Sequence, residues 1–287
     1  MVKLISITFL ILSEITHKSD AWSVKGSQPV SIPSETSRRS FLLNVPTAAG
    51  VLSSSILLPQ AQKSNAIEEE ELIDVYFGCG CFWHVQHEFV EAEKKLLGRS
   101  DMEITARAGY AGGKAGMLNN KVCYHNAMKI SDYGSLGHAE VVGMKIPPSQ
   151  FQNFVVEYCK LFNDKGYRPD QLGDVGPEYR NLVGIPGGIN NIMAKQMVET
   201  SIANGDKLNF AKGNGDDSDY RALAWIMDTK QYPFYIAEQY HQFHDGFNFG
   251  ENYPNSYNSL ASKLGKEGKL DKSDCPNGLI GVGALGL

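Results

Sequence analysis

From residue 72 onward, short apolar runs alternate with stretches in which apolar residues recur every three or four positions. The run "LIDVYFGCG" at 72–80 predicts a buried strand that ends in glycines. From Phe82 the apolar positions follow steps of three and four as far as Leu96, and Gly98 is a natural stop, which predicts a helix. Cys81 therefore lies at the predicted start of a helix.

The rest of the chain continues this alternation. Further strands are predicted at "EITARAGY" (103–110), "AEVVGMKI" (139–146) and "RALAWIMD" (221–228). Helices are predicted at 149–162, with Ser149 as the N-cap, and at 190–203. No repeat of twenty to fifty residues is present, so the pattern predicts a single α/β domain over residues 67–287, whose wiring it does not determine.

The first sixty-six residues have the composition of targeting segments. Residues 1–21 have a basic start at Lys3, an apolar stretch of signal-peptide length and small residues at the end, which predicts a cleaved signal peptide. Residues 22–66 are rich in serine and poor in acids, like a transit peptide. They also contain the pair Arg38 and Arg39, a weakly apolar segment and a small-residue ending, the pattern of a twin-arginine signal.

These three signals in this order resemble the consecutive targeting signals of proteins sent to the thylakoid lumen. We therefore expect a plastid protein, with secretion as the alternative. A membrane anchor over residues 41–58 is disfavoured because Pro46 and Gly50 interrupt the apolar stretch. No stable membrane insertion is expected after processing.

Composition narrows the function classes. The chain has 287 residues, 42% of them apolar and 21% charged, with a formal net charge of -5, which is ordinary for a soluble globular protein. A mildly acidic chain gives no electrostatic reason to bind nucleic acid. The cysteines are too few and too irregularly spaced for a disulfide-stapled scaffold, which favours catalytic or redox use. They are Cys79, Cys81, Cys123, Cys159 and Cys275.

Cys81 is the candidate nucleophile. Backbone N–H groups at a helix start stabilise an anion, so we expect Cys81 to have a lowered pKa and more thiolate than a free thiol. Cys79 lies in the exit of the strand, and both cysteines could instead be small buried apolar residues. A zinc site with His84 and His87 is disfavoured because the spacing does not form two separated ligand pairs. No metal and no cofactor are expected.

Several ordered blocks carry a family resemblance. "GCFW" (80–83) after an apolar strand resembles the active-site motif of the peptide methionine sulfoxide reductase A family. The later blocks are "AGYAGG" (108–113), "GHAEVV" (137–142), "GDVGPEYR" (173–180) and "FYIAEQYHQ" (234–242). The match covers most of residues 74–245. It implies an α+β two-layer sandwich, a ferredoxin-like plait with a mixed sheet, as a single catalytic domain.

The resemblance implies that Cys81 is the nucleophile and Glu140 the acid. Sulfoxide oxygen is a poor leaving group, so a donor must protonate it while the thiolate attacks sulfur. A glutamate is a donor only when an apolar pocket raises its pKa. Phe82 and Trp83 are expected to supply that pocket and to receive the S-methyl group of the substrate.

Further polar groups are implied around the sulfoxide oxygen. Tyr179 would share the oxygen through its hydroxyl, and Asp174 would orient Tyr179 or a water. The second substrate-binding tyrosine of the family falls on Asn119, which departs from the pattern. Tyr133, in a stretch longer than usual for the family, and Tyr124 are the candidates to replace it.

The implied cycle continues with a sulfenic acid on Cys81, which a second thiol converts to a disulfide. Cys275, in a Ser, Asp, Pro and Gly-rich tail, is the first choice of resolving thiol, and Cys123 stays open. Cys159 falls on an apolar helix position, and Cys79 would close a small strained ring. A thioredoxin-type dithiol would restore the thiols of a monomeric enzyme that repairs oxidised protein and takes only the S epimer.

Two other functions remain open at this point. One is a thiol-disulfide oxidoreductase that uses Cys79 and Cys81 as a pair. The other is a non-catalytic binder of oxidised methionine, which Asn119 and the altered C-terminal tail suggest. The reductase is the preferred interpretation because it accounts for all the ordered blocks.

Overall fold

The structure is a computed structural model, and it describes residues 70–115, 121–126, 128–245, 253–270 and Cys275. These residues belong to one compact unit, Glu68–Leu287. The predicted signal peptide, the transit-like and twin-arginine segments and Asn119 lie outside the described residues. The segment boundaries at 21 and 66 stay predictions.

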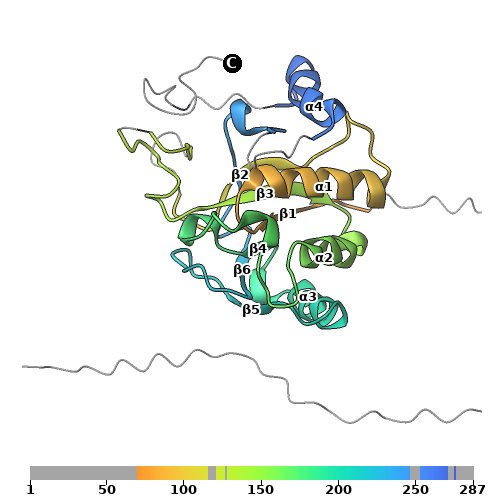
Figure 1. The fold of residues 1–287 in the computed structure, drawn as a ribbon, viewed down its shortest axis with the longest axis vertical. Coiled ribbons are helices and arrows are strands. Elements are labelled where there is room, and N and C mark those ends of the chain that lie inside the picture. The colour runs from red at the N-terminus through yellow and green to blue at the C-terminus, as the bar shows by residue number, and fades with distance from the viewer. Residues whose placement is uncertain (1–69, 116–120, 127, 246–252, 271–274, 276–287) are drawn as a thin grey trace, which may run out of the picture. The chain divides into compact units, whose positions relative to one another are not determined.

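A mixed sheet of seven strands, in the order β5-β6-β4-β1-β3-β2-β7, forms the centre of the described part (Figure 1). Strands β4, β5 and β6 pair in parallel, and every other pairing is antiparallel. The predicted α/β domain with a mixed sheet is confirmed. The ferredoxin-like plait stays a prediction, which the central order β4-β1-β3-β2 supports. The bounds are β1 (Ile73–Gly78), β2 (Arg107–Ala111), β3 (Ala139–Ile146), β4 (Leu182–Ile185), β5 (Asn209–Lys212), β6 (Leu223–Asp228) and β7 (Tyr235–Ile236).

Three of the four described helices, α1 (Phe82–Leu97), α2 (Phe151–Lys160) and α3 (Ile192–Ala203), lie side by side over one face of the sheet (Figure 1). The fourth, α4 (Asn255–Lys266), was not predicted. Among the residues that the structure describes, no helix is long and apolar enough to cross a bilayer.

The start of α2 corrects one prediction. Ser149 belongs to a one-turn 3-10 helix, Pro148–Gln150, and Gln150 occupies the N-cap position of α2. The Ser149 backbone N–H donates instead to a carboxylate oxygen of Glu70 at 2.9 Å. A proline fixes its own φ near the helical value, which lets a tight turn form ahead of the α-helix.

Alternation along the strands decides which side chains face the helices. In β1, Phe77 joins the core under the helices, whereas Tyr76 joins a smaller cluster on the opposite face. In β3, Val142 and Val141 divide in the same way. Since side chains two apart share a face, Glu140 lies on the helix side together with Val142. The strand pattern therefore directs a carboxyl group into the interior.

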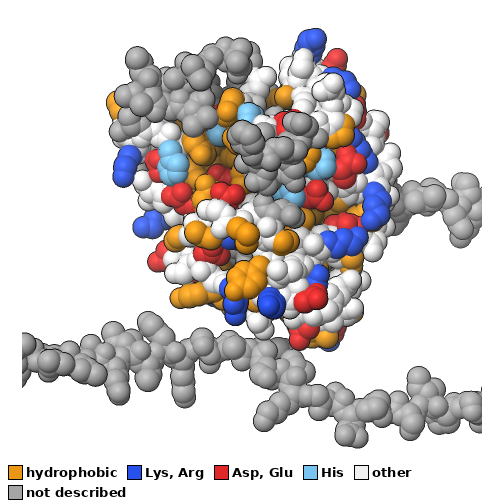
Figure 2. Space-filling model, viewed as in Figure 1, with side chains coloured by type: hydrophobic (Ala, Val, Ile, Leu, Met, Phe, Trp, Pro, Cys, Tyr) orange, Lys and Arg blue, Asp and Glu red, His pale blue; other side chains and the backbone are white. Residues whose placement is uncertain are grey.

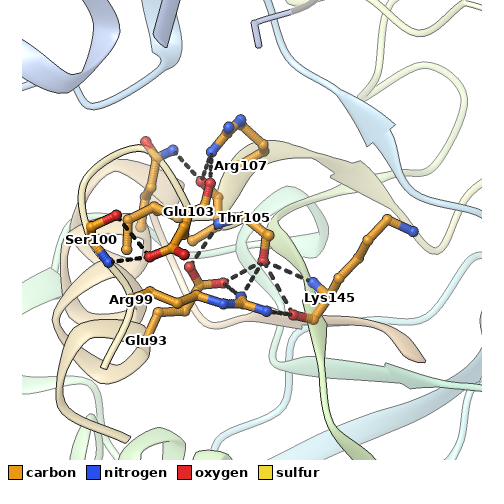
Figure 3. Close-up of polar contacts among 10 residues, drawn as sticks. Glu93, Arg99, Ser100, Glu103, Thr105, Arg107 and Lys145 are labelled. Carbon is orange, nitrogen blue, oxygen red and sulfur yellow. Dashed lines mark hydrogen bonds and ion pairs between the residues drawn. The ribbon is translucent and has the colours of Figure 1, made fainter. Parts of the chain in front are cut away.

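A buried ion pair joins the end of α1 to β2 and β3 (Figure 3). Glu93 is fully buried, and it accepts from Arg99 Nη1 at 2.9 Å and from the Thr105 backbone N–H at 2.7 Å. Arg99 Nη2 also donates to the Lys145 carbonyl at 2.8 Å. Burial raises the pKa of Glu93, and the contacts with Thr105 and Arg99 oppose that rise. The cluster holds the loop before β2 against both strands.

Two buried glutamines attach the late block of the sequence to the sheet. The Gln242 amide accepts from the Ala108 backbone N–H at 3.1 Å and donates to its carbonyl at 2.9 Å, as a neighbouring strand would. Gln86 of α1 donates to Gln242 Oε1 at 3.1 Å and accepts from the Phe243 N–H at 2.7 Å. Residues 234–243 are thereby held beside the start of α1.

Candidate active site

Cys81 is the N-cap residue of α1, directly after the turn that leaves β1. Gly80 has a φ of 81°, and a Cβ at this position would lie 2.0 Å from Gln171 Oε1, so the turn requires glycine. The Cys81 backbone N–H donates to the same Gln171 oxygen, and the Gly80 N–H donates to the Tyr179 carbonyl at 2.9 Å. The predicted position of Cys81 at a helix start is confirmed, and Gln171 is a neighbour that sequence reasoning missed.

The protonation of Cys81 differs from the expectation. Burial raises the pKa of this thiol well above its usual value, and the neighbouring Glu140 carboxyl raises it further. The backbone N–H groups of Trp83 and His84 favour the thiolate but are outweighed. The prediction of a lowered pKa is therefore wrong, because the helix start lies in a desolvated site beside another acid. Burial also raises the pKa of Cys79 to about 12, and that residue is fully buried.

Glu140 projects from β3 toward the first residue of α1. Its side chain is 2% exposed, with Oε2 accepting from the Phe82 backbone N–H at 3.0 Å and Oε1 from the Tyr133 hydroxyl at 3.2 Å. Burial raises the pKa of Glu140 to about 8, against the lowering effect of these two hydrogen bonds. At neutral pH the carboxyl group therefore carries a proton that it can donate.

Aromatic rings surround the first turn of α1. Phe82 is 1% exposed, and its ring centroid lies 6.4 Å from that of Trp83. Trp83 in turn packs on His244 at 3.9 Å and on His241 at 5.8 Å. Figure 2 shows hydrophobic, acidic and histidine side chains together on one face, with Lys and Arg mostly near its rim. The site thus combines apolar walls with a few ionisable groups.

Tyrosines form a second wall of the site. The Tyr133 ring is fully buried between Tyr110 and Tyr124, with ring centroids 4.7 Å and 5.5 Å away. Burial, followed by the Glu140 charge, raises the pKa of Tyr124 and of Tyr179. All of these hydroxyls are therefore protonated donors at neutral pH. The structure brings Tyr133 into direct contact with Glu140 and leaves Tyr124 stacked behind it.

Asp174 and Tyr179 come from the loop that contains "GDVGPEYR". Burial raises the pKa of Asp174, and the Arg168 charge opposes that rise. Asp174 in turn raises the pKa of both Tyr179 and Glu140, which places its carboxyl group in the same electrostatic environment. The loop contributes acidic and phenolic groups to the site, and the Tyr179 carbonyl attaches it to the turn before α1.

Arg180 gathers three of the sequence blocks. Its guanidinium is 1% exposed and donates to the carbonyls of Gly112 and Gly137, each at 3.0 Å, and of Pro177 at 2.6 Å. These carbonyls belong to "AGYAGG", "GHAEVV" and "GDVGPEYR", respectively. One buried cation therefore fixes the loop before β3, the strand that carries Glu140, relative to the loop that carries Tyr179.

An acidic and histidine network extends from Tyr133 toward the surface. Glu178 Oε2 lies 3.3 Å from the Tyr133 hydroxyl and 3.1 Å from His125 Nε2, and His125 Nδ1 lies 2.9 Å from Asp132 Oδ2. A cavity of about 300 Å³ is lined in part by Glu178. Sequence reasoning missed this network, although Glu178 stands inside a quoted block next to Tyr179.

The second pair of cysteines is already joined. Cys123 and Cys275 form a disulfide with an S–S distance of 2.02 Å, whereas Cys79, Cys81 and Cys159 are free thiols. The predicted resolving residue Cys275 is thus bonded to the alternative candidate and not to Cys81. Cys159 is 2% exposed in the core, where its apolar helix position predicts it.

Glu238 of the late block lies beside this disulfide. A carboxylate oxygen of Glu238 and the two sulfurs lie within 4.8 Å of one another. Such a group could hold a metal ion only after reduction, because disulfide sulfurs are not thiolate ligands. The Tyr110 hydroxyl and the Tyr124 backbone N–H donate to Glu238 at 2.9 Å and 2.8 Å. These contacts connect the disulfide to the tyrosine wall.

A family model and individual relatives of the same description match this chain. A family model described as "Peptide methionine sulfoxide reductase" matches residues 73–274. "Peptide methionine sulfoxide reductase MsrA" of Pseudomonas aeruginosa PAO1 is 30% identical over 175 residues, which are 60% of this chain and 67% of the relative. The protein of the same description from Geobacter sulfurreducens is 32% identical over 124 residues, or 40% and 62% of the two chains.

Solved structures give a weaker likeness. "Methionine sulfoxide reductase A of Corynebacterium diphtheriae" matches with a TM-score of 0.37 and 19% identity, over 74% of this chain and 82% of that one. Mxr1 from Saccharomyces cerevisiae in reduced form matches with a TM-score of 0.35 and 19% identity, over 60% and 82%. The family assignment therefore rests on the sequence matches.

Proposed function

Because the chain belongs to the peptide methionine sulfoxide reductase family, and is accordingly a peptide-methionine (S)-S-oxide reductase, we propose that it reduces the S epimer of methionine sulfoxide, free or in proteins, through Cys81. The supporting observation is Glu140, a carboxyl group with a pKa of about 8 that accepts from the N–H of the residue after Cys81. A buried neutral acid beside a thiol is the pair that sulfoxide reduction requires.

The first chemical step transfers oxygen from the substrate to Cys81. Glu140 donates its proton to the sulfoxide oxygen while the Cys81 thiolate attacks the sulfur. The attack forms a bond between the Cys81 sulfur and the substrate sulfur. The hydroxyl group then passes from the substrate sulfur to the Cys81 sulfur as the S–O and S–S bonds break, which releases methionine and leaves Cys81 as a sulfenic acid. The Cys81 thiol has released one proton to solvent and Glu140 has given one to the oxygen, so Glu140 takes a proton back from solvent before the next turnover.

The raised pKa of Cys81 has a role in this step. A Cys81 thiolate and a Glu140 carboxylate each oppose the formation of the other, so the free site holds its protons. When the sulfoxide oxygen takes the Glu140 hydrogen bond, Glu140 stays neutral and no longer competes as an anion. Substrate binding thus favours the thiolate at the moment it is needed.

Substrate recognition follows from the walls of the site. Phe82 and Trp83 offer apolar surface to the S-methyl group, while the hydroxyls of Tyr133 and Tyr179 donate to the sulfoxide oxygen. Tyr133 thereby takes the place of the family tyrosine that Asn119 does not supply. Asp174 orients Tyr179 or a water.

Resolution involves Cys275 and Cys123 in sequence. The Cys275 thiol attacks the sulfenic acid of Cys81, which forms a disulfide and releases water. The Cys123 thiol then displaces Cys81, which leaves the Cys123–Cys275 bond and a free Cys81. A thioredoxin-type dithiol reduces that bond and completes the cycle. For the chain as a whole we propose a monomeric repair enzyme of the thylakoid lumen.

Turnover of an S-sulfoxide peptide tests the proposal, with thioredoxin or a small dithiol as reductant. Cys81→Ser abolishes methionine formation, because it removes the proposed nucleophile. Cys123→Ser accumulates a bond between Cys81 and Cys275, which peptide mass mapping detects. Cys159→Ala, which removes a free thiol from the core, is the matched control and retains turnover. Full activity of Cys81→Ser, or a bond between Cys79 and Cys81 in the oxidised protein, would contradict the proposal.

A further inference from the structure

The hydroxyl of Tyr133 lies between two carboxyl groups. Its oxygen is 3.2 Å from Glu140 Oε1 and 3.3 Å from Glu178 Oε2. A phenol has one hydrogen to donate, so the two carboxyl groups compete for it. The group that receives the hydrogen is favoured as a carboxylate, and the other meets the lone pairs of the hydroxyl oxygen.

Glu178 is held in place by partners outside the catalytic pair. His125 Nε2 lies 3.1 Å from Glu178 Oε2, and His125 Nδ1 lies 2.9 Å from Asp132 Oδ2. Asp132 Oδ1 also accepts from the Ser135 backbone N–H at 2.8 Å. Burial alone would raise the pKa of Asp132, but these hydrogen bonds lower it, so Asp132 is ionised at neutral pH. An ionised Asp132 accepts the Nδ1 hydrogen of His125 and fixes the direction of the ring.

The backbone also makes room for Glu178. A Cβ on Gly134 would lie 1.9 Å from Glu178 Oε1, so the Glu178 side chain occupies space that only glycine leaves open. Gly134 directly follows Tyr133 in the stretch that is longer than usual for the family. That stretch therefore supplies the tyrosine, the glycine over which Glu178 packs and the Asp132 that orients His125.

We propose that Glu178 is a positioning residue for Glu140: by accepting the hydroxyl hydrogen of Tyr133, it turns the lone pairs of that hydroxyl toward Glu140 and keeps the acid protonated between turnovers. The proposal rests on the function proposed above. Glu178 does not contact the reacting atoms, and it acts only through Tyr133.

The Tyr133 hydroxyl then changes its hydrogen-bond acceptor during each cycle. Between turnovers, the Glu140 O–H donates to Tyr133 and the Tyr133 O–H donates to Glu178; when substrate is bound, both O–H groups donate to the sulfoxide oxygen instead. After Glu140 has given its proton to the sulfoxide oxygen, the Tyr133 O–H rotates to the new Glu140 carboxylate. Tyr133 neither gains nor loses a proton, so the rotation only changes which carboxyl group is stabilised as an anion.

Other charges act on Glu140 in known directions. Asp174 and Glu178 raise its pKa, and the Phe82 N–H lowers it. Cys81, Tyr110, Tyr124 and Tyr179 are the remaining titratable groups that interact with Glu140. Glu178 itself faces His125 and Tyr133. A test of Glu178 must therefore separate two effects on the pKa of Glu140: the hydrogen bond between Glu178 and Tyr133, and the negative charge of Glu178.

The experiment measures the protonation of Glu140 in wild type and Glu178→Gln by infrared difference titration, with Glu140→Gln identifying the band. In parallel, the pH dependence of single-turnover methionine formation is measured. We expect the pKa of Glu140 to fall by about one unit in Glu178→Gln, which lowers the single-turnover rate roughly tenfold on the alkaline side and leaves it unchanged on the acidic side.

The Tyr133→Phe background separates the two effects of Glu178. There, Glu178→Gln should shift the pKa of Glu140 by less than half as much, because no hydroxyl hydrogen remains to be shared. An equal shift in both backgrounds would mean that Glu178 acts by charge alone and would overturn the proposal. Glu157→Gln removes a carboxylate that pairs with Lys95 and Lys160 and is the control without a shift.

A second variant guards against a folding defect in Glu178→Gln. His125→Gln releases Glu178 without removing it and should shift the Glu140 pKa in the same direction by a smaller amount. No shift in either variant would refute the proposal. Because the infrared titration needs no turnover, it decides the role of Glu178 even if the wild type fails to reduce the sulfoxide, which would instead refute the proposed function.

Discussion

Glu93 and Glu140 are both buried glutamates, and burial raises the pKa of each. Glu93 has a cation at 2.9 Å in Arg99 together with hydrogen bonds from Thr105 (Figure 3). Among the described residues, Glu140 accepts hydrogen bonds from a backbone N–H and a phenol, and the charges of Asp174 and Glu178 raise its pKa further. Burial acts in the same direction at both glutamates. The Arg99 charge opposes the rise in the pKa of Glu93, whereas the neighbouring acidic groups add to the rise in the pKa of Glu140.

The two environments also differ in how they are built. Glu93 and Thr105 stand on either side of one short connection, so local chain geometry brings the pair together. Glu140 meets Phe82 and Tyr133 only because β3 lies next to β1 and the loop before β3 folds back. The same substitution in both glutamates therefore tests the contrast directly.

Glu140→Gln should have the largest effect on activity. The amide keeps the shape but cannot protonate the sulfoxide oxygen, so single-turnover methionine formation should fall by about 100- to 10,000-fold. Stopped reactions with reduced protein and an S-sulfoxide peptide measure this rate. A loss of less than tenfold would remove Glu140 from the role of acid.

Glu93→Gln should change stability and leave the chemistry alone. Loss of the charge leaves the partly buried Arg99 without its anion, and we expect the free energy of unfolding to fall by about 2 to 3 kcal/mol. Urea unfolding measures the change, and the single-turnover rate per folded molecule serves as the control. An activity loss as large as that of Glu140→Gln would erase the distinction between the two sites.

The smallest expected effect is the change in the free energy of unfolding, per pH unit, that comes from Glu140. The folded-state pKa of Glu140, about 8, lies above the unfolded value of about 4.3, so between these values the folded protein binds one more proton than the unfolded one. The stability that Glu140 contributes is complete below the unfolded value and declines as pH rises toward 8.

Glu140→Gln should therefore gain stability relative to wild type as pH increases from about 5 to 8, by at most about 1.4 kcal/mol per pH unit. Unfolding of both proteins in urea across this range measures the difference. A difference that stays constant with pH would mean that the pKa of Glu140 is not raised in the folded protein.

Local periodicity predicts much of the fold because it depends on neighbours in sequence. The steps of three and four after Phe82 correctly place α1, and the run at 139–146 matches β3 residue for residue. The short strands β4, β5 and β7 and the helix α4 were not predicted, since two to four residues carry little period and α4 lies in a polar segment. The start of α2 differs because prolines form a separate turn there.

The residues of the candidate site also divide into those with a local sequence signal and those without one. Cys81, Glu140 and Tyr179 stand in recognisable blocks, and Tyr133 was named as a replacement for the missing tyrosine. The partners that set their protonation were not predictable, because Gln171, Glu178 and His125 reach the site through long-range contacts with no local signature. The pKa of Cys81 was mispredicted for this reason: the helix start was visible in the sequence, whereas the depth of its burial was not.

The Cys123–Cys275 disulfide spans 152 residues of sequence, from the segment before β3 to a point beyond α4. Closing a loop of this length restricts the unfolded chain by roughly 5 kcal/mol in the chain-entropy account. In the proposed cycle this bond forms only after Cys123 and Cys275 have been oxidised. The oxidised enzyme is therefore more stable against unfolding than the reduced one. When oxidants outpace the supply of reductant, the enzyme accumulates in this more stable form until a reductant restores its thiols.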